Sequence, residues 1–305
     1  HYATQIARYW VESLARVPVA CEVASEFHYR QPATAPYNTA IAISQSGESL
    51  DTLMAMRHAA ACGLQTIGLV NVPSSTIARE ADAVLPTRAG PEIGVASTKA
   101  FTAQLTILLC FTVALARAKG QIDEAHAEAI HAEIQALPGL VGKALGLFDA
   151  IQPVAHQLSQ AKSALYLGRG ALYPLAMEGA LKLKELSYIH AEGFASGEMK
   201  HGPIALIEED LPVVALLAAD AVMAKASSNL REASARGGKI ILLSEARAAA
   251  EVDYASAVIA VPDVDPLLAP ILLAIPAQIL AYLTAVEKGT DVDQPRNLAK
   301  SVTVE

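Results

Sequence analysis

The sequence has few cysteines, few aromatic residues and no cluster of basic residues. Its three cysteines, Cys21, Cys62 and Cys110, lie far apart in apolar patterns, which excludes a disulfide framework and a cysteine-based zinc site. The formal net charge is -8, and no run of Lys and Arg offers a surface for nucleic acid or for an anionic membrane. No signal peptide precedes the first helical pattern. These absences favour a cytoplasmic protein that binds neither nucleic acid nor membrane.

Signals for cofactors and metals are also missing. Gly168-Arg169-Gly170 follows a predicted strand, but no third glycine completes the fingerprint of a dinucleotide-binding loop. His126 and His131 are five residues apart, a spacing that does not place two imidazoles on one helix face for a metal ion. We therefore expect no cofactor and no metal site.

Apolar residues make up 53% of the chain and aromatic residues 5%, so the interior is expected to be rich in Ala, Leu, Ile and Val. At 305 residues the chain exceeds what one core usually supports, and two domains of about 150 residues are expected. Residues 267–286 are apolar over a length that could span a bilayer. Pro270 and Pro276 interrupt this segment and acidic residues flank it, which favours a buried helix.

The chain contains an internal duplication. Three segments recur in the same order and at the same separation: 63–67 and 237–241, 81–85 and 255–259, 103–105 and 277–279. Two tandem copies of one fold explain this regularity better than a single domain does.

Each copy contains short runs that are apolar on both faces and alternate with helical patterns, which predicts parallel sheets covered by helices on both sides. The predicted strands are 39–44, 65–71 and 82–86 in the first copy, and 163–167, 212–218, 239–244 and 256–262 in the second. A counterpart of strand 163–167 would precede His1, so we expect the chain to be a fragment of a longer protein. Predicted helix breaks at Pro138-Gly139 and at Pro153 divide a helical linker between the copies.

The segment Ser44-Gln45-Ser46-Gly47-Glu48-Ser49 joins a predicted strand to a predicted helix. Its hydroxyls and backbone N–H groups would lie at the positive end of the helix dipole, where a phosphate dianion gains most. Gly47 allows a tight turn close to the ligand. The alternative is an ordinary Ser-rich turn in which Ser49 only caps the next helix. In the second copy the counterpart, residues 217–220, lacks the hydroxyls.

Glu178, Lys182 and Glu185 fall on one stripe of the helix predicted over residues 174–187. A solvated stripe of salt bridges is one interpretation. The other is a proton-transfer group, because small residues crowd this helix and the following loop, 195–203, brings His201 and other ionisable groups nearby.

Four segments together resemble the sugar-isomerase (SIS) half of the glucosamine-6-phosphate synthase family: residues 44–48, 92–101, 178–185 and the C-terminal tail from residue 289. The resemblance covers essentially the whole chain. It implies an α/β fold of two tandem SIS-type (flavodoxin-like) three-layer αβα domains related by a pseudo-twofold duplication. The implied parts are a phosphate-binding first SIS domain at 1–125 with its first strand missing, a helical linker at 126–160, a second SIS domain at 161–290 and an active-site tail at 291–305.

The resemblance also assigns roles to individual residues. Ser44, Gln45, Ser46 and Ser49 would hold the sugar phosphate, and Val95, Ser97 and Ala299 would contact the sugar hydroxyls. Lys300 would form a Schiff base with the opened ketose, Glu185 would move a proton between C1 and C2, Lys182 would assist through its charge, and His201 of a neighbouring subunit would open the sugar ring. Two departures stand out: residue 49 is usually threonine in the family, and a further phosphate-binding loop would precede His1.

The implied reaction converts fructose 6-phosphate and ammonia into glucosamine 6-phosphate, which begins hexosamine biosynthesis. An imine at C2 acidifies the C1 hydrogen, and a carboxylate then returns that proton at C2. The glutaminase half that would release ammonia is absent from the 305 residues, so we expect no use of glutamine. We expect free ammonia as the nitrogen source, or interconversion of fructose 6-phosphate and glucose 6-phosphate, in a cytoplasmic homodimer.

Two other functions remain open from the sequence. A regulatory SIS module would bind a sugar phosphate without turning it over. A different SIS enzyme, such as a deaminase or deglycase of amino-sugar phosphates, would share the Ser44–Ser49 loop and the base but not this tail.

Overall fold

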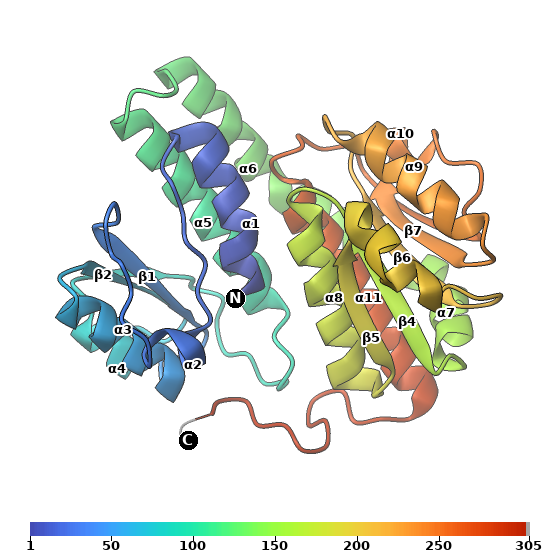
Figure 1. Cartoon of the computed structure of the whole chain (residues 1–305), viewed down its shortest axis with the longest axis horizontal. Helices are drawn as coiled ribbons and strands as arrows, with labels where there is room; N and C mark the ends of the chain where they lie inside the picture. Colours follow the sequence, from blue (N-terminus) through green and yellow to red (C-terminus); the bar gives the residue numbers. More distant parts are fainter. Residues whose placement is uncertain (303–305) are drawn as a thin grey trace. The chain divides into compact units, whose positions relative to one another are not determined.

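The computed structural model describes residues 1–302 and divides them into two compact units (Figure 1). Unit 1 comprises His1, residues 3–123 and the end of the chain from Asn297 onward, whereas unit 2 comprises Tyr2 and residues 124–296. Part of the predicted C-terminal tail, residues 303–305, lies outside the described residues.

Unit 1 is built around a parallel sheet. Its elements are α1 (Tyr2–Trp10), the π-helical turn η1 (Val11–Ala15), α2 (Ala24–Phe27), β1 (Thr39–Ser44), α3 (Leu50–Ala61), β2 (Gln65–Val70), α4 (Thr76–Glu80), β3 (Ala83–Pro86) and α5 (Lys99–Ala118). The three strands predicted from apolar runs are confirmed to within one residue at each end.

The sheet of unit 1 has the order β1-β2-β3 within the described residues. Helices α3 and α4 lie beside this sheet (Figure 1), and they pack on it through an apolar cluster that includes Leu53, Val70 and Ile77. The register places Ser44, Val70 and Pro86 side by side. Because the strands are parallel, the loops that follow these three residues meet at one edge of the sheet.

Unit 2 contains a helical segment followed by the second sheet. Its elements are α6 (Glu124–Leu145), α7 (Phe148–Ser159), β4 (Ser163–Gly168), α8 (Leu172–Ser187), β5 (His190–Ala195), the 3₁₀ turns η2 (Ser196–His201) and η3 (Pro203–Leu206), β6 (Pro212–Leu217), α9 (Met223–Ser234), β7 (Lys239–Glu245), α10 (Ala246–Ala249), β8 (Ala257–Val261) and α11 (Ala269–Lys288).

In the described part of unit 2 the parallel sheet has the order β5-β4-β6-β7-β8, and helices bury both of its faces. Leu165 and Leu167 of β4 join an apolar cluster with α9 residues such as Leu230. Tyr166 points to the opposite face, where a Cβ on Gly179 of α8 would lie 2.8 Å from its ring. Glycine is therefore required for this close approach. The expected three-layer arrangement is confirmed in unit 2.

Strand β5 is an addition that the apolar runs do not reveal. Its sequence, His-Ala-Glu-Gly-Phe-Ala, is not apolar throughout, and β4 is the neighbour with which it pairs. Residues 195–203, predicted as a loop, mostly form the turns η2 and η3. An edge strand needs only one apolar face, so its sequence signal is weaker than that of the central strands.

The apolar segment near the end of the chain is helix α11. By length and composition, α5 and α11 are the two single helices of the described chain that could cross a membrane. In α11, however, 83% of the apolar window is buried inside the structure, where the helix packs against α8 and α7. The prediction of a buried helix is confirmed. In α5 the buried share is 50%.

Both predicted helix breaks, at Pro138-Gly139 and at Pro153, are wrong. Helix α6 runs through Pro138, and α7 contains Pro153. The break falls between these helices instead, with a bend of 58°. Buried Ile130, Leu137 and Ala144 repeat every seven residues along one face of α6, so packing on both sides of Pro138 keeps the helix continuous.

Candidate active site

In unit 1 the predicted phosphate loop follows β1, as the sequence pattern indicated. The Ser44 hydroxyl is buried, accepts a hydrogen bond from the Gly47 N–H (3.0 Å) and donates one to the Ser49 hydroxyl (3.3 Å). Gly47 has a φ of +68°, and a Cβ there would lie 2.0 Å from the Ser75 hydroxyl. The loop is thus a tight turn that only glycine permits at position 47.

The alternative of an ordinary capping turn is not supported. Ser49 is the N-cap residue of α3, but its side chain makes no capping hydrogen bond to the described part of that helix. In α4 the N-cap residue Ser75 does accept one, from the Ala78 N–H. The Ser49 hydroxyl faces Ser44 instead, so its role lies in the loop rather than in the cap.

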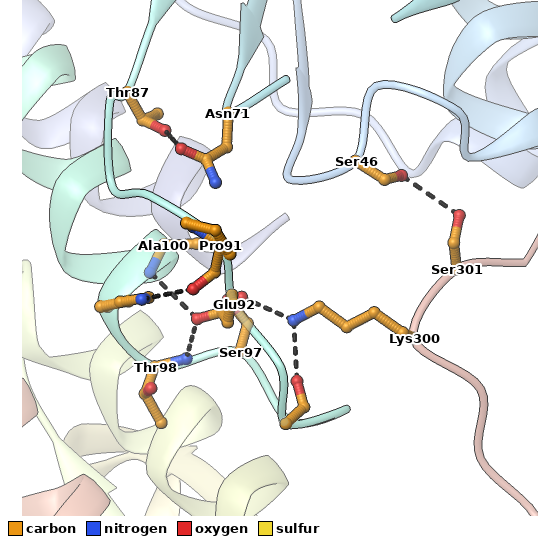
Figure 2. Close-up of polar contacts among 12 residues, drawn as sticks. Ser46, Asn71, Thr87, Pro91, Glu92, Ser97, Thr98, Ala100, Lys300 and Ser301 are labelled. Atoms are coloured by element: carbon orange, nitrogen blue, oxygen red, sulfur yellow. Dashed lines mark hydrogen bonds and ion pairs between the residues drawn. The ribbon is translucent and has the colours of Figure 1, made fainter. Parts of the chain in front are cut away.

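Residues 301 and 302 of the C-terminal tail contact this loop. The hydroxyls of Ser46 and Ser301 are 3.1 Å apart, and the Leu50 N–H donates to the Val302 carbonyl over 3.1 Å. Figure 2 shows Ser301 facing Ser46. The Val302 carbonyl therefore accepts the hydrogen bond of a backbone N–H group in the first turn of α3. Free N–H groups at this position of a helix are the groups that bind anions.

Lys300 reaches the loop between β3 and α5. Its ammonium group donates to the Glu92 carboxylate (2.6 Å) and to the Gly94 carbonyl (2.8 Å). Glu92 also accepts hydrogen bonds from the Ser97 hydroxyl (3.2 Å) and from the backbone N–H groups of Thr98 (2.9 Å) and Ala100 (3.1 Å), as drawn in Figure 2. The predicted site residues Lys300 and Ser97 thus meet at one carboxylate.

Glu92 stays ionised in this position. Burial of its side chain, which is 4% exposed, acts to raise its pKa. Hydrogen bonds from Lys300 and from the N–H groups of Thr98 and Ala100 outweigh burial, so the pKa is lowered below the ordinary value. Glu92 begins the segment 92–101 that carries part of the resemblance, but the sequence alone assigns it no role, because its pairing with Lys300 depends on contacts between distant parts of the chain.

In unit 2 the predicted polar stripe of α8 is buried, so the interpretation as a solvated row of salt bridges is wrong. The Lys182 ammonium lies 2.6 Å from the Glu185 carboxylate and 3.5 Å from that of Glu178. The side chains of Lys182 and Glu178 are 4% and 9% exposed, and that of Glu185 is 21% exposed. Glu185 is the carboxylate of this group that a ligand could reach.

Burial and the attraction between the three side chains together set their charges. Burial raises the pKa of Glu178, and the nearby Lys182 only partly offsets the shift. Burial alone would lower the pKa of Lys182, but the carboxylates of Glu178 and Glu185 outweigh it and raise the pKa. Lys182 therefore remains an ammonium beside Glu185, and Glu178 is the member of the group that resists ionisation.

The sequence matches the profile of the SIS domain over residues 1–114 and 157–288. The chain belongs to the SIS-domain family. The two matched segments lie in the two copies inferred from internal repeats, so the predicted tandem SIS organisation is confirmed.

Two relatives refine this placement within SIS proteins. The chain is 54% identical to a glutamine-fructose-6-phosphate aminotransferase (isomerizing) of Zymomonas mobilis over its full length, and spans 50% of that protein. The C-terminal domain of the glucosamine-fructose-6-phosphate aminotransferase from Francisella tularensis is 42% identical, with a TM-score of 0.93 over 96% of this chain and 84% of that domain. The resemblance stated from the sequence is confirmed.

A more distant structure shares the SIS fold alone. Glucosamine-6-phosphate deaminase from Thermotoga maritima has a TM-score of 0.78 at 21% identity, over 99% of this chain and 87% of the other. At this identity the likeness shows a shared fold alone.

The remaining predicted site residues are distributed over both units of the SIS pair. Gln45 and Val95 of unit 1 are partly buried, and Ala299 is exposed; the Gln45 carbonyl accepts from the Asn71 N–H over 3.1 Å. His201 ends the turn η2 of unit 2 and is exposed. Phosphate-loop and tail residues thus belong to unit 1, whereas Lys182, Glu185 and His201 belong to unit 2.

Proposed function

We propose that this chain carries the isomerising chemistry of glucosamine-6-phosphate synthesis, with fructose 6-phosphate as substrate and ammonia as nitrogen donor. The chain spans about half the length of the curated relatives it matches, so this activity is proposed for the 305 residues alone. In the absence of ammonia, the same groups would interconvert fructose 6-phosphate and glucose 6-phosphate.

The phosphate would bind at the loop after β1. Ser44, Gln45, Ser46 and Ser49 supply neutral donors beside the first turn of α3, and each hydrogen bond to a charged phosphate oxygen contributes about 1.5–3 kcal/mol. The tail contacts at Ser46 and Leu50 would give way to the phosphate. Val95, Ser97 and Ala299 are the proposed contacts of the sugar hydroxyls.

Lys300 or ammonia would convert the C2 carbonyl of the opened ketose into an imine, with loss of water. The Glu185 carboxylate would remove a proton from C1, giving an enolamine, and return it to C2, which yields the 2-amino aldose when ammonia is the amine. Lys182, at 2.6 Å from Glu185, would hold this carboxylate in place and stabilise its charge.

His201 would act on the ring oxygen of the closed sugar, contributed by a second copy of the chain. Its exposure on η2 leaves it available to a neighbouring molecule. We therefore propose a homodimer as the working unit and the cytoplasm, where the sugar phosphates would be found, as its location.

The observation that carries this proposal is the polar group on α8. A partly exposed carboxylate held against a buried ammonium is what proton transfer beside a carbonyl requires. A module that only binds sugar phosphates has no need for such a group, and burying it has a cost that packing with apolar side chains would avoid.

The test is to incubate the chain with fructose 6-phosphate and ammonium and to assay glucosamine 6-phosphate. Glu185→Gln should lower the rate by about 10²–10⁴-fold, the range of a general base, while leaving the affinity for fructose 6-phosphate unchanged. The control is Glu251→Gln, an exposed glutamate of unit 2. Full activity in Glu185→Gln would refute the assigned base, and sugar binding without turnover in a dimeric wild type would favour a regulatory SIS module.

A further inference from the structure

Glu92 lies at the junction of two segments that are 208 positions apart in the sequence. Its oxygen Oε1 accepts from the backbone N–H groups of Thr98 and Ala100, at the start of α5. Its oxygen Oε2 accepts from the Ser97 hydroxyl and from the Lys300 ammonium. Oε1 thus binds only backbone groups of its own loop, whereas Oε2 is shared between Ser97 of that loop and Lys300 of the tail.

The two tail residues after Lys300 contact unit 1 through uncharged groups. Ser301 meets Ser46 through two hydroxyls, and Val302 offers a carbonyl to the Leu50 N–H. Hydrogen bonds between neutral groups contribute less than those between ions. The Glu92–Lys300 contact, with Glu92 almost fully buried and Lys300 26% exposed, is therefore the strongest of these attachments.

We infer that Glu92 is the positioning residue of the C-terminal tail: its Oε2 atom seats Lys300 beside Gly94 and Ser97, and through Lys300 it holds Ser301 and Val302 on the phosphate loop. Glu92 acts on the substrate only through Lys300. Where the inference concerns imine formation it rests on the function proposed above, whereas the seating of the tail does not depend on that function.

The geometry offers a variant that separates the two halves of the carboxylate. In Glu92→Gln the amide oxygen can keep the hydrogen bonds from Thr98 and Ala100, so the loop retains its shape. The amide NH₂ then faces the Lys300 ammonium, and two donors cannot bond to one another. The variant therefore keeps the loop but removes the acceptor that holds Lys300 of the tail.

The first measurement is the rate at which a water-soluble N-hydroxysuccinimide ester acylates Lys300, read by mass spectrometry. The exposed Lys288 is the internal reference on the same molecule. Without any sugar present, we expect Lys300 to react at least about tenfold slower than Lys288 in the wild type, as one charged hydrogen bond implies. Glu92→Gln should remove this difference.

The matched control is Glu80→Gln. Glu80 forms an ion pair with Arg57 in the same unit, at 2.6 Å, so this variant makes the same change in charge away from the tail. It should leave the Lys300 rate at its wild-type value. Equal Lys300 rates in the wild type and Glu92→Gln would overturn the inference, as would an increase of equal size in Glu80→Gln.

A second variant keeps the inference testable if Glu92→Gln does not fold. Lys300→Met leaves Glu92 and its loop intact, and hydrogen exchange at the Leu50 amide, which donates to Val302, reports whether the tail is seated. We expect exchange to become about tenfold faster. Unchanged exchange would mean that Ser301 and Val302 hold the tail without the ion pair.

Reductive trapping with fructose 6-phosphate and cyanoborohydride then separates this inference from the proposed function. A sugar adduct on Lys300 in the wild type that is strongly reduced in Glu92→Gln supports both. A second outcome is slow acylation of Lys300 in the wild type, fast acylation in Glu92→Gln and no sugar adduct in the wild type. This outcome supports Glu92 as the residue that positions the tail, and it refutes Lys300 as the imine-forming amine.

Discussion

Two corresponding residues, one directly after β2 and one at the end of β7, both accept backbone hydrogen bonds, but one is a neutral amide and the other a carboxylate. In unit 1 this residue is Asn71, whose side-chain oxygen accepts from the Thr87 hydroxyl (2.9 Å) and the Ala89 N–H (2.8 Å). At the same distance from the first residue of β7 in unit 2 lies Glu245, which is fully buried. Its carboxylate accepts from the N–H groups of Ala219 (2.7 Å) and Val264 (3.3 Å).

Ala219 is the counterpart of Ser46, counted from the start of β6 and β1. In unit 2 the N–H group at this position already binds an anion that belongs to the chain itself, and the hydroxyl is gone. In unit 1 a neutral amide holds the strand ends together, and the hydroxyls of the loop are left for a ligand or for the tail. In unit 2 an internal carboxylate therefore takes the place at this N–H group that a bound anion could occupy.

The largest expected effect tests the internal carboxylate. Glu245→Ala should lower the free energy of unfolding by about 3–5 kcal/mol, because it leaves the N–H groups of Ala219 and Val264 without their acceptor and removes the ion pair with Arg247. Urea denaturation measures this. The exposed Glu251 is the control, and Glu251→Ala should stay within about 0.5 kcal/mol of the wild type. Equal losses in both variants would remove the basis of the comparison.

The second prediction concerns the loop hydroxyls. Ser46→Ala should weaken binding of fructose 6-phosphate by about tenfold or more, since it removes a hydrogen bond to a charged oxygen. Isothermal titration calorimetry measures this affinity. Ala219→Ser, which restores the hydroxyl in unit 2, should create no second binding event, because Glu245 already occupies the N–H of residue 219. A second event in Ala219→Ser would contradict the argument.

A smaller effect separates the two N-cap serines of unit 1. Ser75→Ala should lower the free energy of unfolding by about 1 kcal/mol, because the Ser75 hydroxyl caps α4. Ser49→Ala should change it by less than about 0.5 kcal/mol, since Ser49 caps nothing in the described helix α3. If thermal or urea unfolding gave the reverse order, the Ser49 hydroxyl would be structural and its proposed place in the phosphate site would weaken.

The smallest expected effect is on the titration of Glu92. Its pKa lies below the ordinary value of 4.5, so the stability it contributes is present above that value and is lost as the pH falls through the lowered pKa. Lys300→Gln removes one of the hydrogen bonds that lower the pKa and should raise it towards the ordinary value. Carbon-13 NMR of the side-chain carboxyl, assigned with Glu92→Gln, follows the change; an unaltered titration would show that Lys300 does not stabilise the charge.

Much of this molecule follows from local sequence patterns. Short apolar runs mark every described strand except β5, because helices cover both faces of a parallel sheet. Internal repeats reveal the duplication, and the polar loop after β1 lies at the carboxyl edge of the sheet, as any such loop must. The stripe of Glu178, Lys182 and Glu185 is likewise fixed by helical spacing.

Other features depend on which distant segments pack together. Pattern alone leaves the stripe on α8 either solvated or buried, and the fold decides for burial by packing α8 against β4, β5 and α11. Strand β5 depends on pairing with β4, and the pairing of Glu92 with Lys300 requires the end of the chain to return to unit 1. Most helices and strands, and the polar groups they carry, can be predicted from the sequence, because they depend on neighbours along the chain. The burial, pairing and charge of those groups follow only from the fold, because they depend on which distant segments pack together.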